Sequence, residues 1–512
     1  MDIKKEMKGP DDYETDVAVA HSATLGVADE EFREYTELSG LFQGPRLRKV
    51  TRKIDFRVLP QLLLIYLISY VDRSNVGNAR LFGAAADMKL SGQQWNAGLS
   101  VFFVTYGAFA VPSNIMLKRV GQRIWLSTLI TGVGIVCVCS GLQVNYAGWI
   151  SFRLLLGVVE AGVYSGCTYA LTSWYSPKEL HSRMTLFYSG GALSGAFSGL
   201  LAYAIGQLDH TWGYRGWRFI YVIEGIFTTL IGIISFFWLI PEPDQAGKWL
   251  DDEERRFLIL RHRFAAGGES GIAEKEEFSW KHAGAAFRSI HVYPLAMIGF
   301  AVSGVIYAIS FTLPTIINNL GYSAADAQAL TVPPYVFACL CTVVAGFAAD
   351  KYEKRMLSIF VPSIFAAIGC AIVMCTVRFS GMEGATLFGC FIMAGGLYPA
   401  VPSVTAWVSL NVAGSMKRAV AIAITFTLTV LSGILGSNIF LAAEAPEYTT
   451  GFSVSLVMIT VFSIFTSLAY WMVLKRINSK RAAIPTEEIK AKYTEAELAD
   501  MGDLSPAFRY AT

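Results

Sequence analysis

Charged side chains are scarce in this chain of 512 residues. They make up 16% of the sequence, while hydrophobic residues make up 54%. Soluble domains carry roughly 25% charged residues, so the shortage of charge excludes an ordinary soluble domain. The mean hydropathy of +0.45 agrees with this. The composition therefore predicts an integral membrane protein before any motif is considered.

The sequence also lacks the arrangements that bind metals, cofactors or nucleic acid. Its eight cysteines all fall in apolar segments without a metal-ligand spacing to a histidine, so we interpret them as small buried side chains. The six histidines lie outside the predicted spans, and neither a Walker loop nor a nucleophile elbow occurs. The net charge of +2 rests on basic residues in loops. We therefore predict no enzyme activity, no metal, no cofactor and no nucleic-acid partner.

What the sequence has instead is a series of long apolar runs. A transmembrane helix needs roughly 20 mostly apolar residues, and twelve segments meet that requirement. They lie near residues 57–80, 93–117, 123–143, 147–174, 184–206, 217–240, 292–317, 328–349, 356–377, 384–409, 418–442 and 451–474. The predicted fold is an all-α membrane protein with twelve transmembrane helices in two six-helix repeats.

Polar segments divide this predicted fold into five parts. The parts are a mostly disordered tail at 1–54, a six-helix bundle at 55–240, a linker at 241–290, a second six-helix bundle at 291–475 and a tail at 476–512.

The linker contains a segment with an amphipathic helical pattern. In WLDDEERRFLILRHRF (249–264), Leu250, Phe257 and Leu258 fall on one face of a helix. We predict an amphipathic helix that lies on the cytoplasmic surface. A helix that binds a partner protein is the alternative.

Lysine and arginine are concentrated in alternate loops. They are frequent before span one, in loops 2–3, 4–5, 8–9 and 10–11, in the linker and after the last span, whereas the opposite loops carry few. The positive-inside rule then places both termini and the linker in the cytoplasm. We expect a monomeric, multi-pass protein of the plasma membrane, in contact with the lipid bilayer.

The two halves repeat each other weakly. Ala161-Gly162 in span four and Ala394-Gly395 in span ten each precede a tryptophan by the same spacing. Such repeats around a central cavity are typical of secondary transporters. Span ten also contains GGLYPAVP (395–402), whose glycines and prolines predict a bent or broken helix.

A loop motif in the second half resembles that of the major facilitator superfamily. GFAADKYEKR (346–355) carries Gly346, Asp350, Lys351 and Arg355 at the motif positions, with Glu353 in place of an expected glycine. The resemblance implies an inner gate, in which Asp350 accepts hydrogen bonds from a neighbouring helix N-terminus. An ordinary solvated loop charge is the alternative.

The first half holds a more degraded copy of the same motif. LKRVGQR (117–123) keeps Arg119, Gly121 and Arg123, but Lys118 replaces the expected aspartate. The shared position of the two copies supports the repeat and assigns these three residues to the inner gate as well.

Four further motifs point to one branch of that superfamily. They are DRSNVGNA (72–79), RLLLGVVEAG (153–162), Trp174-Tyr175 followed by Arg183, and Gly216-Trp217-Arg218 followed by Glu224-Gly225. Together they resemble the fungal anion:cation symporter family, which includes allantoate and nicotinate permeases. The resemblance spans all twelve segments and implies proton-coupled uptake of a small organic anion by alternating access. Nicotinate, allantoate and pantothenate are candidate substrates; an exporter of a carboxylated fungal metabolite and a non-transporting nutrient sensor are the alternatives.

Three charged residues are predicted to lie deep in the membrane. At about 1.5 Å of helical rise per residue, Asp72 and Arg73 lie about 15 Å, and Glu160 about 16 Å, below the outer surface. A lone charge at this depth costs about 2.5–3.5 kcal/mol, which pairing or a wet cavity offsets. Arg73 is predicted to hold a substrate carboxylate with its guanidinium fork. Glu160, or else Asp72, is predicted to carry the proton, unless the charges form a permanent ion pair between spans one and four.

Other polar and aromatic residues have two interpretations each. Arg153 is an outer gate or reaches the headgroups, and Glu224 pairs structurally with an arginine or belongs to that gate. Asn75 contacts substrate or a neighbouring helix. Tyr398 and Trp407 bind the substrate, as a flat ring would allow, or pack at helix interfaces.

Overall fold

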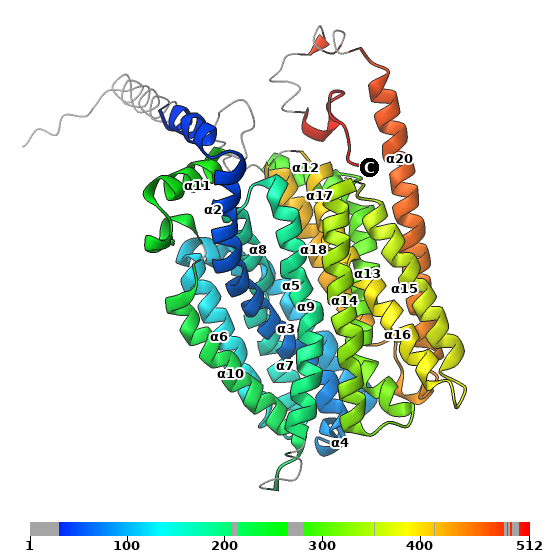
Figure 1. Ribbon diagram of the computed structural model, residues 1–512. Helices are drawn as coiled ribbons and strands as arrows, with labels where there is room; N and C mark the ends of the chain where they lie inside the picture. The colour runs from blue at the N-terminus through cyan, green and yellow to red at the C-terminus, as the bar shows by residue number, and fades with distance from the viewer. Residues whose placement is uncertain are drawn as a thin grey trace, which may run out of the picture.

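The structure is a computed structural model that shows a bundle of long helices (Figure 1). It describes residues 30–206, 208, 213–240, 242–264, 280–352, 354–413, 415–485, 489, 492–493 and 501–512. Among these residues the regular secondary structure is helical throughout and contains no strand.

The first half contains six membrane-crossing segments. They are α3 (Leu59–Leu81), α5 (Gly92–Val120), α6 (Gln122–Ser140), α7 (Tyr146–Glu160) continued by α8 (Val163–Trp174), α9 (Pro177–Gly206) and α10 (Gly216–Trp238). The short α4 (Ala84–Asp87) follows α3.

The second half repeats this pattern. Its six segments are α13 (Val292–Asn319), α14 (Ala324–Tyr352), α15 (Leu357–Thr376), α16 (Glu383–Leu397) continued by α17 (Ala400–Asn411), α18 (Ser415–Gly436), and a last one made of α19 (Thr449–Val457), a π-helical stretch (Met458–Phe465) and α20 (Thr466–Ala482). The predicted twelve-helix fold is confirmed.

Ten of the described helical segments are long and apolar enough to cross a membrane by length and composition alone. A shorter apolar helix at Val420–Gly436 lies in α18, and α9 completes the twelve. The middle of α9, YSGGALSGAFSG (188–199), is rich in glycine and serine, which lowers its hydropathy.

Local sequence signals explain where several helices begin. Ser91 precedes α5 and accepts a hydrogen bond from the backbone N–H of Gln94, whose side chain accepts one from Ser91 N–H in return. This capping box satisfies two otherwise unpaired donors. Asn145 similarly accepts from the N–H of Gly148 at the start of α7.

Corresponding helices of the two halves are interrupted. Span four breaks between α7 and α8, where a Cβ on Gly162 would lie 1.9 Å from Ser113 Oγ of α5, so that only glycine allows this approach. Span ten breaks between α16 and α17 at Tyr398-Pro399, because proline has no N–H to continue the helix. The predicted break in span ten is therefore present, and span four has one as well.

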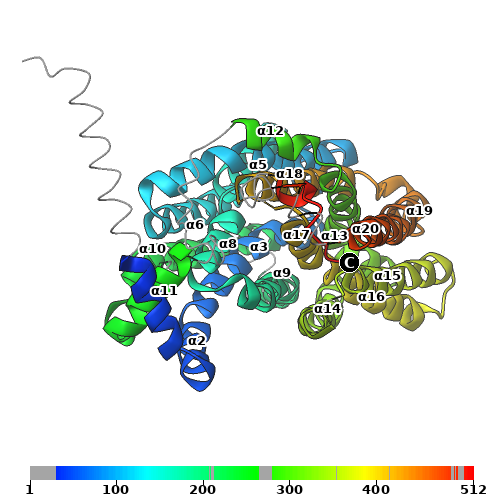
Figure 2. The ribbon, with the colours of Figure 1, turned by 90° about the horizontal axis from the view of Figure 1, so that it is seen from above.

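Two of the helix pairs through which the halves contact each other involve small side chains. In the first pair, Gly195 of α9 faces the Tyr335 ring and Gly346 of α14 faces Thr185, with close approaches of 2.9 and 2.4 Å for an added Cβ. These contacts lie towards opposite ends of the helices, so α9 and α14 pack antiparallel over much of their length, and small residues make this possible. In the second pair, Ser100 of α5 meets Ser437, the residue that follows α18, and their hydroxyls are 3.0 Å apart. Figure 2 shows both helix pairs from above.

The helices outside the bundle gather at one end, which we call the terminal face. It carries α2 (Gly44–Arg57), α11 (Asp252–Phe264), α12 (Trp280–Arg288) and the C-terminus, while α4 lies at the other end, the opposite face (Figure 1). Residues 1–29 of the predicted N-terminal tail lie outside the described residues. Within that tail, 30–41 and α2 are helical, which the sequence pattern did not predict.

The linker helix α11 is amphipathic, as the sequence pattern predicted, but protein covers its apolar face. Phe257 and Leu258 are 3% and 2% exposed, and the Phe257 ring stacks on Phe42 at 4.6 Å between centroids. Lys53 of α2 pairs with Glu254 of α11 at 2.7 Å. The helix therefore packs on the N-terminal helices and the first half, and not on lipid through this face.

Candidate functional site

Arg73 and Glu160 meet inside the first half. Arg73 lies midway along α3, and Glu160 is the last residue of α7, next to the helix break. The Nε of Arg73 donates to Glu160 Oε1 at 3.0 Å, and its Nη2 donates to the same oxygen. The second oxygen, Oε2, is buried without a hydrogen-bond partner among the described residues. Only one of the two carboxylate oxygens of Glu160 therefore takes part in the ion pair with Arg73.

Aromatic rings surround the Arg73 guanidinium. Its carbon lies 5.0 Å from the ring centroids of Tyr70 and Tyr106 and 5.2 Å from that of Phe102. Tyr307 of α13 contributes a hydroxyl that accepts from Arg73 Nη1 at 3.4 Å. Ring faces stabilise a buried cation, so this charge is supported by both halves of the protein.

A small cavity adjoins Arg73 at the interface between the halves. Its free volume is about 40 Å³, which is room for a few water molecules. Its hydroxyl-bearing lining residues are Tyr66, Tyr70, Tyr106, Tyr164, Tyr188, Tyr307, Ser303, Thr405, Thr425 and Thr429. The cavity thus combines one cation with many rings and hydroxyl groups.

One hydroxyl in this lining has no partner. The Oγ1 of Thr425, on α18, is buried and makes no hydrogen bond to any described residue. A buried hydroxyl without a partner is costly, so a ligand that bonds to Thr425 would gain affinity from it.

An aromatic pair separates this cavity from a second one. Tyr164 of α8 and Phe426 of α18 stack with centroids 4.7 Å apart and planes at 5°. Tyr164 and Thr405 line both cavities. The second cavity has about 150 Å³ of free volume and extends towards the terminal face, past Leu180 and Arg355.

Towards the opposite face, tightly packed side chains close the central cavity. The Phe103 ring lies 4.7 Å from Tyr307 and 6.2 Å from Phe311 between centroids. Gly433 lies directly against Phe103, and Gly77 lies against the carbonyl of Phe311. The path from Arg73 is therefore blocked by several layers on this side and by the Tyr164–Phe426 pair on the other.

Asp72 points away from the cavity into the first half. It is 1% exposed, and its Oδ1 accepts a hydrogen bond from Cys137 Sγ at 3.3 Å. Its Oδ2 has no partner among the described residues. Among all the described residues, no group of three or more His, Cys, Asp and Glu side chains is arranged to hold a metal ion.

Asn75 and Glu224 form a second buried polar contact. Asn75 Nδ2 donates to Glu224 Oε2, and Ser198 Oγ donates to Asn75 Oδ1 at 2.9 Å. Asn75 is fully buried and is not among the cavity-lining residues. Of its two predicted roles, the structure shows the contact with neighbouring helices.

Arg153 lies in the interior of the first half. It is 5% exposed, its Nη2 donates to the Tyr221 hydroxyl at 2.9 Å, and its guanidinium lies 4.6 Å from the Trp149 ring centroid. The side chain does not reach outward to the headgroups, so that interpretation is wrong. The predicted pairing of Glu224 with an arginine is also absent among the described ion pairs, because Glu224 bonds to Asn75 instead.

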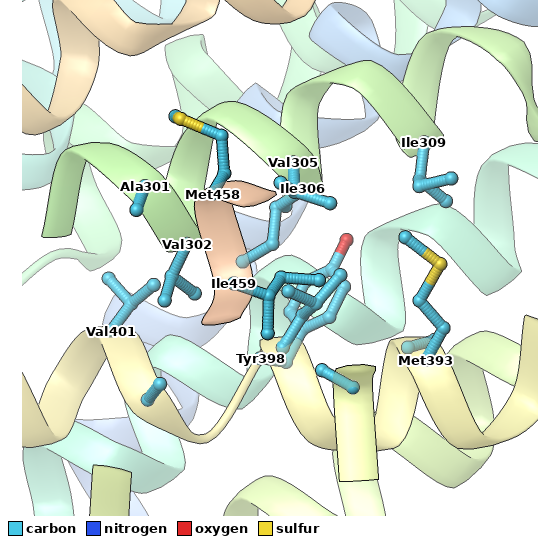
Figure 3. Packing of buried hydrophobic residues seen from close by; sticks show 14 of the residues in the cluster. Ala301, Val302, Val305, Ile306, Ile309, Met393, Tyr398, Val401, Met458 and Ile459 are labelled. Carbon is cyan, nitrogen blue, oxygen red and sulfur yellow. The ribbon is translucent and has the colours of Figure 1, made fainter. Parts of the chain in front are cut away.

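Tyr398 and Trp407 lie apart from the Arg73 cavity. Figure 3 shows Tyr398 within the apolar core of the second half, beside Ile459 and Met393. Trp407 is fully buried and donates through Nε1 to the carbonyl of Ala511, at 2.8 Å, in the C-terminal segment. Neither residue is positioned here to contact an anion at Arg73.

The C-terminal segment 501–512 is bound to the second half. Asn411 of α17 accepts from Ala511 N–H at 2.8 Å and donates to its carbonyl at 3.3 Å. Asn478 of α20 makes the same pair of bonds with Tyr510, at 2.9 and 2.8 Å. This segment belongs to the predicted C-terminal tail, and the sequence pattern gave no signal for its docking.

The first copy of the loop motif joins α5 to α6. Gly121 has φ of +92°, a conformation that favours glycine. Arg123 donates to the Leu239 carbonyl at 2.8 Å, whereas Arg119 is exposed.

The second copy lies at the end of α14. Gly346 is in the contact with α9, Arg355 lines the terminal-face cavity, and Lys351 is exposed. The Asp350 side chain lies outside the described residues, so its gate role stays a prediction.

The cavity tyrosines of the first half were not predicted as site residues. Tyr66 and Tyr70 are one helical turn apart on α3, and Arg73 follows three residues later. This spacing places all three side chains on neighbouring parts of one helix surface, and it is the signal that would have found them. Tyr106 and Tyr188 come from other helices and carry no such signal.

Comparisons with known proteins agree with this architecture. Residues 62–437 match the family model of the Major Facilitator Superfamily. The chain is 37% identical over 507 residues to the MFS-type transporter cnsO of Penicillium expansum, covering 97% of each chain. It is 29% identical to the high-affinity nicotinic acid transporter of Saccharomyces cerevisiae, covering 86% of this chain and 80% of the relative.

Among solved structures, a bacterial homologue of the human lysosomal transporter Spinster matches with a TM-score of 0.63 and 17% identity, over 85% of this chain and 98% of that one. This likeness concerns the fold alone. The family model and the curated relatives together identify the chain as a multi-pass membrane transporter of the Major Facilitator Superfamily.

Proposed function

We propose that this protein imports a small organic anion together with a proton. The observation that carries this proposal is the buried Arg73, held by a single oxygen of Glu160 beside a cavity between the two halves. A buried cation beside a cavity between the two halves is a binding group for an anion, and a buried carboxylate next to it is a group that a proton neutralises.

Anion and proton binding are coupled through Arg73 in this proposal. A guanidinium holds a carboxylate best with two parallel hydrogen bonds, and both donors now reach Glu160 Oε1. An arriving carboxylate takes these donors and releases Glu160. A buried carboxylate without its ion pair is strongly disfavoured, so Glu160 then takes up a proton, and the two species enter together.

We infer that the preferred anion carries a planar ring. Tyrosine rings line the cavity beside Arg73, and flat rings stack favourably on such side chains. Thr425 Oγ1 offers an unused hydrogen bond for a ring nitrogen or a second polar group. Nicotinate has these features, and one relative of this chain is named as a nicotinic acid transporter. The free volume of about 40 Å³ is too small for such a ring, so the cavity has to widen on binding.

We further propose that the terminal face lies in the cytoplasm of a plasma-membrane protein. The layers between Arg73 and the opposite face would then close the outer side, while the Tyr164–Phe426 pair would be a thin inner gate. Separation of this pair joins the two cavities and opens Arg73 to the cytoplasm. The protein would act as a monomer, since both halves of the cavity come from one chain.

Uptake of labelled carboxylates by a permease-deficient yeast that expresses this protein tests the proposal. We expect nicotinate to accumulate faster at pH 5 than at pH 7, and an unlabelled excess of nicotinate to compete. Nicotinamide is the matched control, because it keeps the ring but lacks the charge. Equal transport of nicotinamide, or accumulation that is independent of external pH, would contradict an anion–proton symporter.

A further inference from the structure

Glu224 is a buried carboxyl group that the exchange at Arg73 does not use. It lies on α10, is 4% exposed and is not among the residues that line the central cavity. Its Oε2 accepts from Asn75, while its Oε1 is buried without a partner among the described residues. A substrate in the central cavity has no contact with it.

Asp72 is also a buried carboxyl group that does not line the central cavity, and it lies close to Glu224. Its Oδ2 is also buried without a described partner. Asn75 follows Asp72 by one turn of α3, so the bond from Asn75 to Glu224 brings the carboxyl group of α10 to the same turn. Cys137 Sγ, which donates to Asp72 Oδ1, also lies 3.5 Å from the carbonyl of Tyr221, one turn before Glu224 on α10.

Groups on every neighbouring helix define the surroundings of this pair. Cys137 of α6 donates to Asp72, and Ser198 of α9 bonds to Asn75. Arg153 of α7 bonds to the hydroxyl of Tyr221, one turn before Glu224 on α10. Of these side chains only Arg153 brings a positive charge.

The buried charges of the first half do not balance when all are ionised. Arg73 is paired with Glu160, which leaves Arg153 to offset both Asp72 and Glu224. One negative charge would remain in the interior, and an uncompensated buried charge costs several kcal/mol. A single proton shared by two neighbouring carboxyl groups removes it, because close like charges disfavour ionisation of both.

We propose that Asp72 and Glu224 share one proton, and that Glu224 is therefore a proton-coupling residue that never touches the substrate. This inference rests on the proposed function. The shared proton leaves the pair with one negative charge, which Arg153 offsets, so that the exchange at Glu160 takes place beside a neutral interior. Removing the charge of Glu224 leaves Asp72 alone opposite Arg153, which weakens its hold on the proton.

The test is the pH profile of anion uptake into proteoliposomes, with each profile normalised to its own maximum. For Glu224→Gln we expect the half-maximal pH to fall by about one unit, a tenfold higher proton concentration. The Asp72→Asn/Glu224→Gln double variant is expected to show no further shift beyond Asp72→Asn, because the pair acts as one unit. Glu383→Gln, which changes a carboxylate at the first residue of α16, away from the central cavity, is the matched control and should keep the wild-type profile.

Each outcome supports or overturns the inference. A Glu224→Gln profile that overlays the wild type overturns it, since a purely structural role lowers the amount of folded protein without moving the normalised profile. If Glu224→Gln does not fold, Glu224→Asp separates the pair by one methylene and must shift the profile in the same direction. Wild-type uptake that is independent of pH would instead contradict the proposed function itself.

Discussion

The two halves of this protein share a helix pattern but differ in their buried chemistry. The first half buries five charged residues in its membrane helices: Asp72, Arg73, Arg153, Glu160 and Glu224. Among the described residues of α13 to α20, no buried Asp, Glu, Lys or Arg occurs, and the core there is built from side chains such as Val302, Ile306 and Ile459 (Figure 3).

This difference indicates a division of labour within one repeated fold. In the proposed mechanism, the groups that exchange protons all lie in one half, so the distances between them stay fixed when the halves move. The second half supplies hydroxyl groups and rings that face them, namely Tyr307, Thr425 and Phe426. In that mechanism, a substrate between the halves contacts a cation on one side and hydroxyl groups and rings on the other.

The largest expected effect comes from the ionic side. Arg73→Ala removes the cation and should abolish uptake, and Arg73→Lys should lower kcat/KM by about 10- to 100-fold, because a charged hydrogen bond contributes about 1.5–3 kcal/mol and an ammonium cannot form the bidentate pair. Initial uptake rates, corrected for the amount of protein at the membrane, measure this. Arg378→Ala is the control, since this arginine is 46% exposed and pairs with Glu447 outside the bundle. Normal transport by Arg73→Lys would contradict the proposal that the Arg73 guanidinium binds the substrate carboxylate through two hydrogen bonds.

The next effect concerns a contact of the second half that lies away from the central cavity, between α17 and the C-terminal segment. Asn411→Ala removes both bonds to Ala511, and we expect a loss of about 1–3 kcal/mol in stability, as for buried partners left unpaired. Thermal unfolding in detergent measures it. Removal of residues 501–512 should lower Tm similarly, and the two changes together should not add. Additive changes would mean that Asn411 acts elsewhere.

A smaller effect is expected where the second half meets the substrate. Thr425→Val keeps the shape but removes the unpaired hydroxyl, and the KM for nicotinate should rise about 2- to 12-fold, the equivalent of one neutral hydrogen bond of about 0.5–1.5 kcal/mol. Thr425→Ser should stay near the wild type. If Thr425→Val and Thr425→Ser have the same KM for nicotinate, the Thr425 hydroxyl does not bind the substrate.

The smallest effect concerns the surface of the first half. The hydrogen bond from Arg256 lowers the pKa of Glu34, so this contact stabilises the folded state above the ordinary carboxyl pKa and is lost as pH falls through the lowered value. Arg256→Ala should therefore lower Tm slightly at pH 7 and by less at pH 3, within a few tenths of a kcal/mol for an exposed pair. Arg255→Ala, whose partner Asp252 lies on the same helix, is the control. An equal Tm change at both pH values would rule out a carboxylate contact.

Local sequence patterns were sufficient for the twelve helices and for part of the site. Apolar runs and loop charges each predict one helix at a time. The helical rise per residue was sufficient to predict that Arg73 and Glu160 lie at the same depth in the membrane. The break in span ten followed from Pro399 and its neighbours.

Other features depend on contacts between distant segments, which no local pattern encodes. Asn75 lies one turn from Asp72, yet its role is decided by Glu224 on α10. Trp407 has the aromatic character of a binding residue, but it bonds to Ala511, far along the chain. The tyrosines around Arg73 come from several helices, so their convergence depends on tertiary packing.

The central claim is that an anion and Glu160 compete for Arg73, and that Glu160 takes up the proton. The most direct test is the affinity for nicotinate, measured by isothermal titration calorimetry across pH on purified wild-type protein and on Glu160→Gln. A glutamine keeps the shape but cannot hold Arg73 as an ion or bind the proton. The account predicts wild-type binding that tightens as pH falls and a much smaller pH dependence in Glu160→Gln, where only the Asp72–Glu224 pair still titrates. A pH dependence in Glu160→Gln equal to that of the wild type would contradict it.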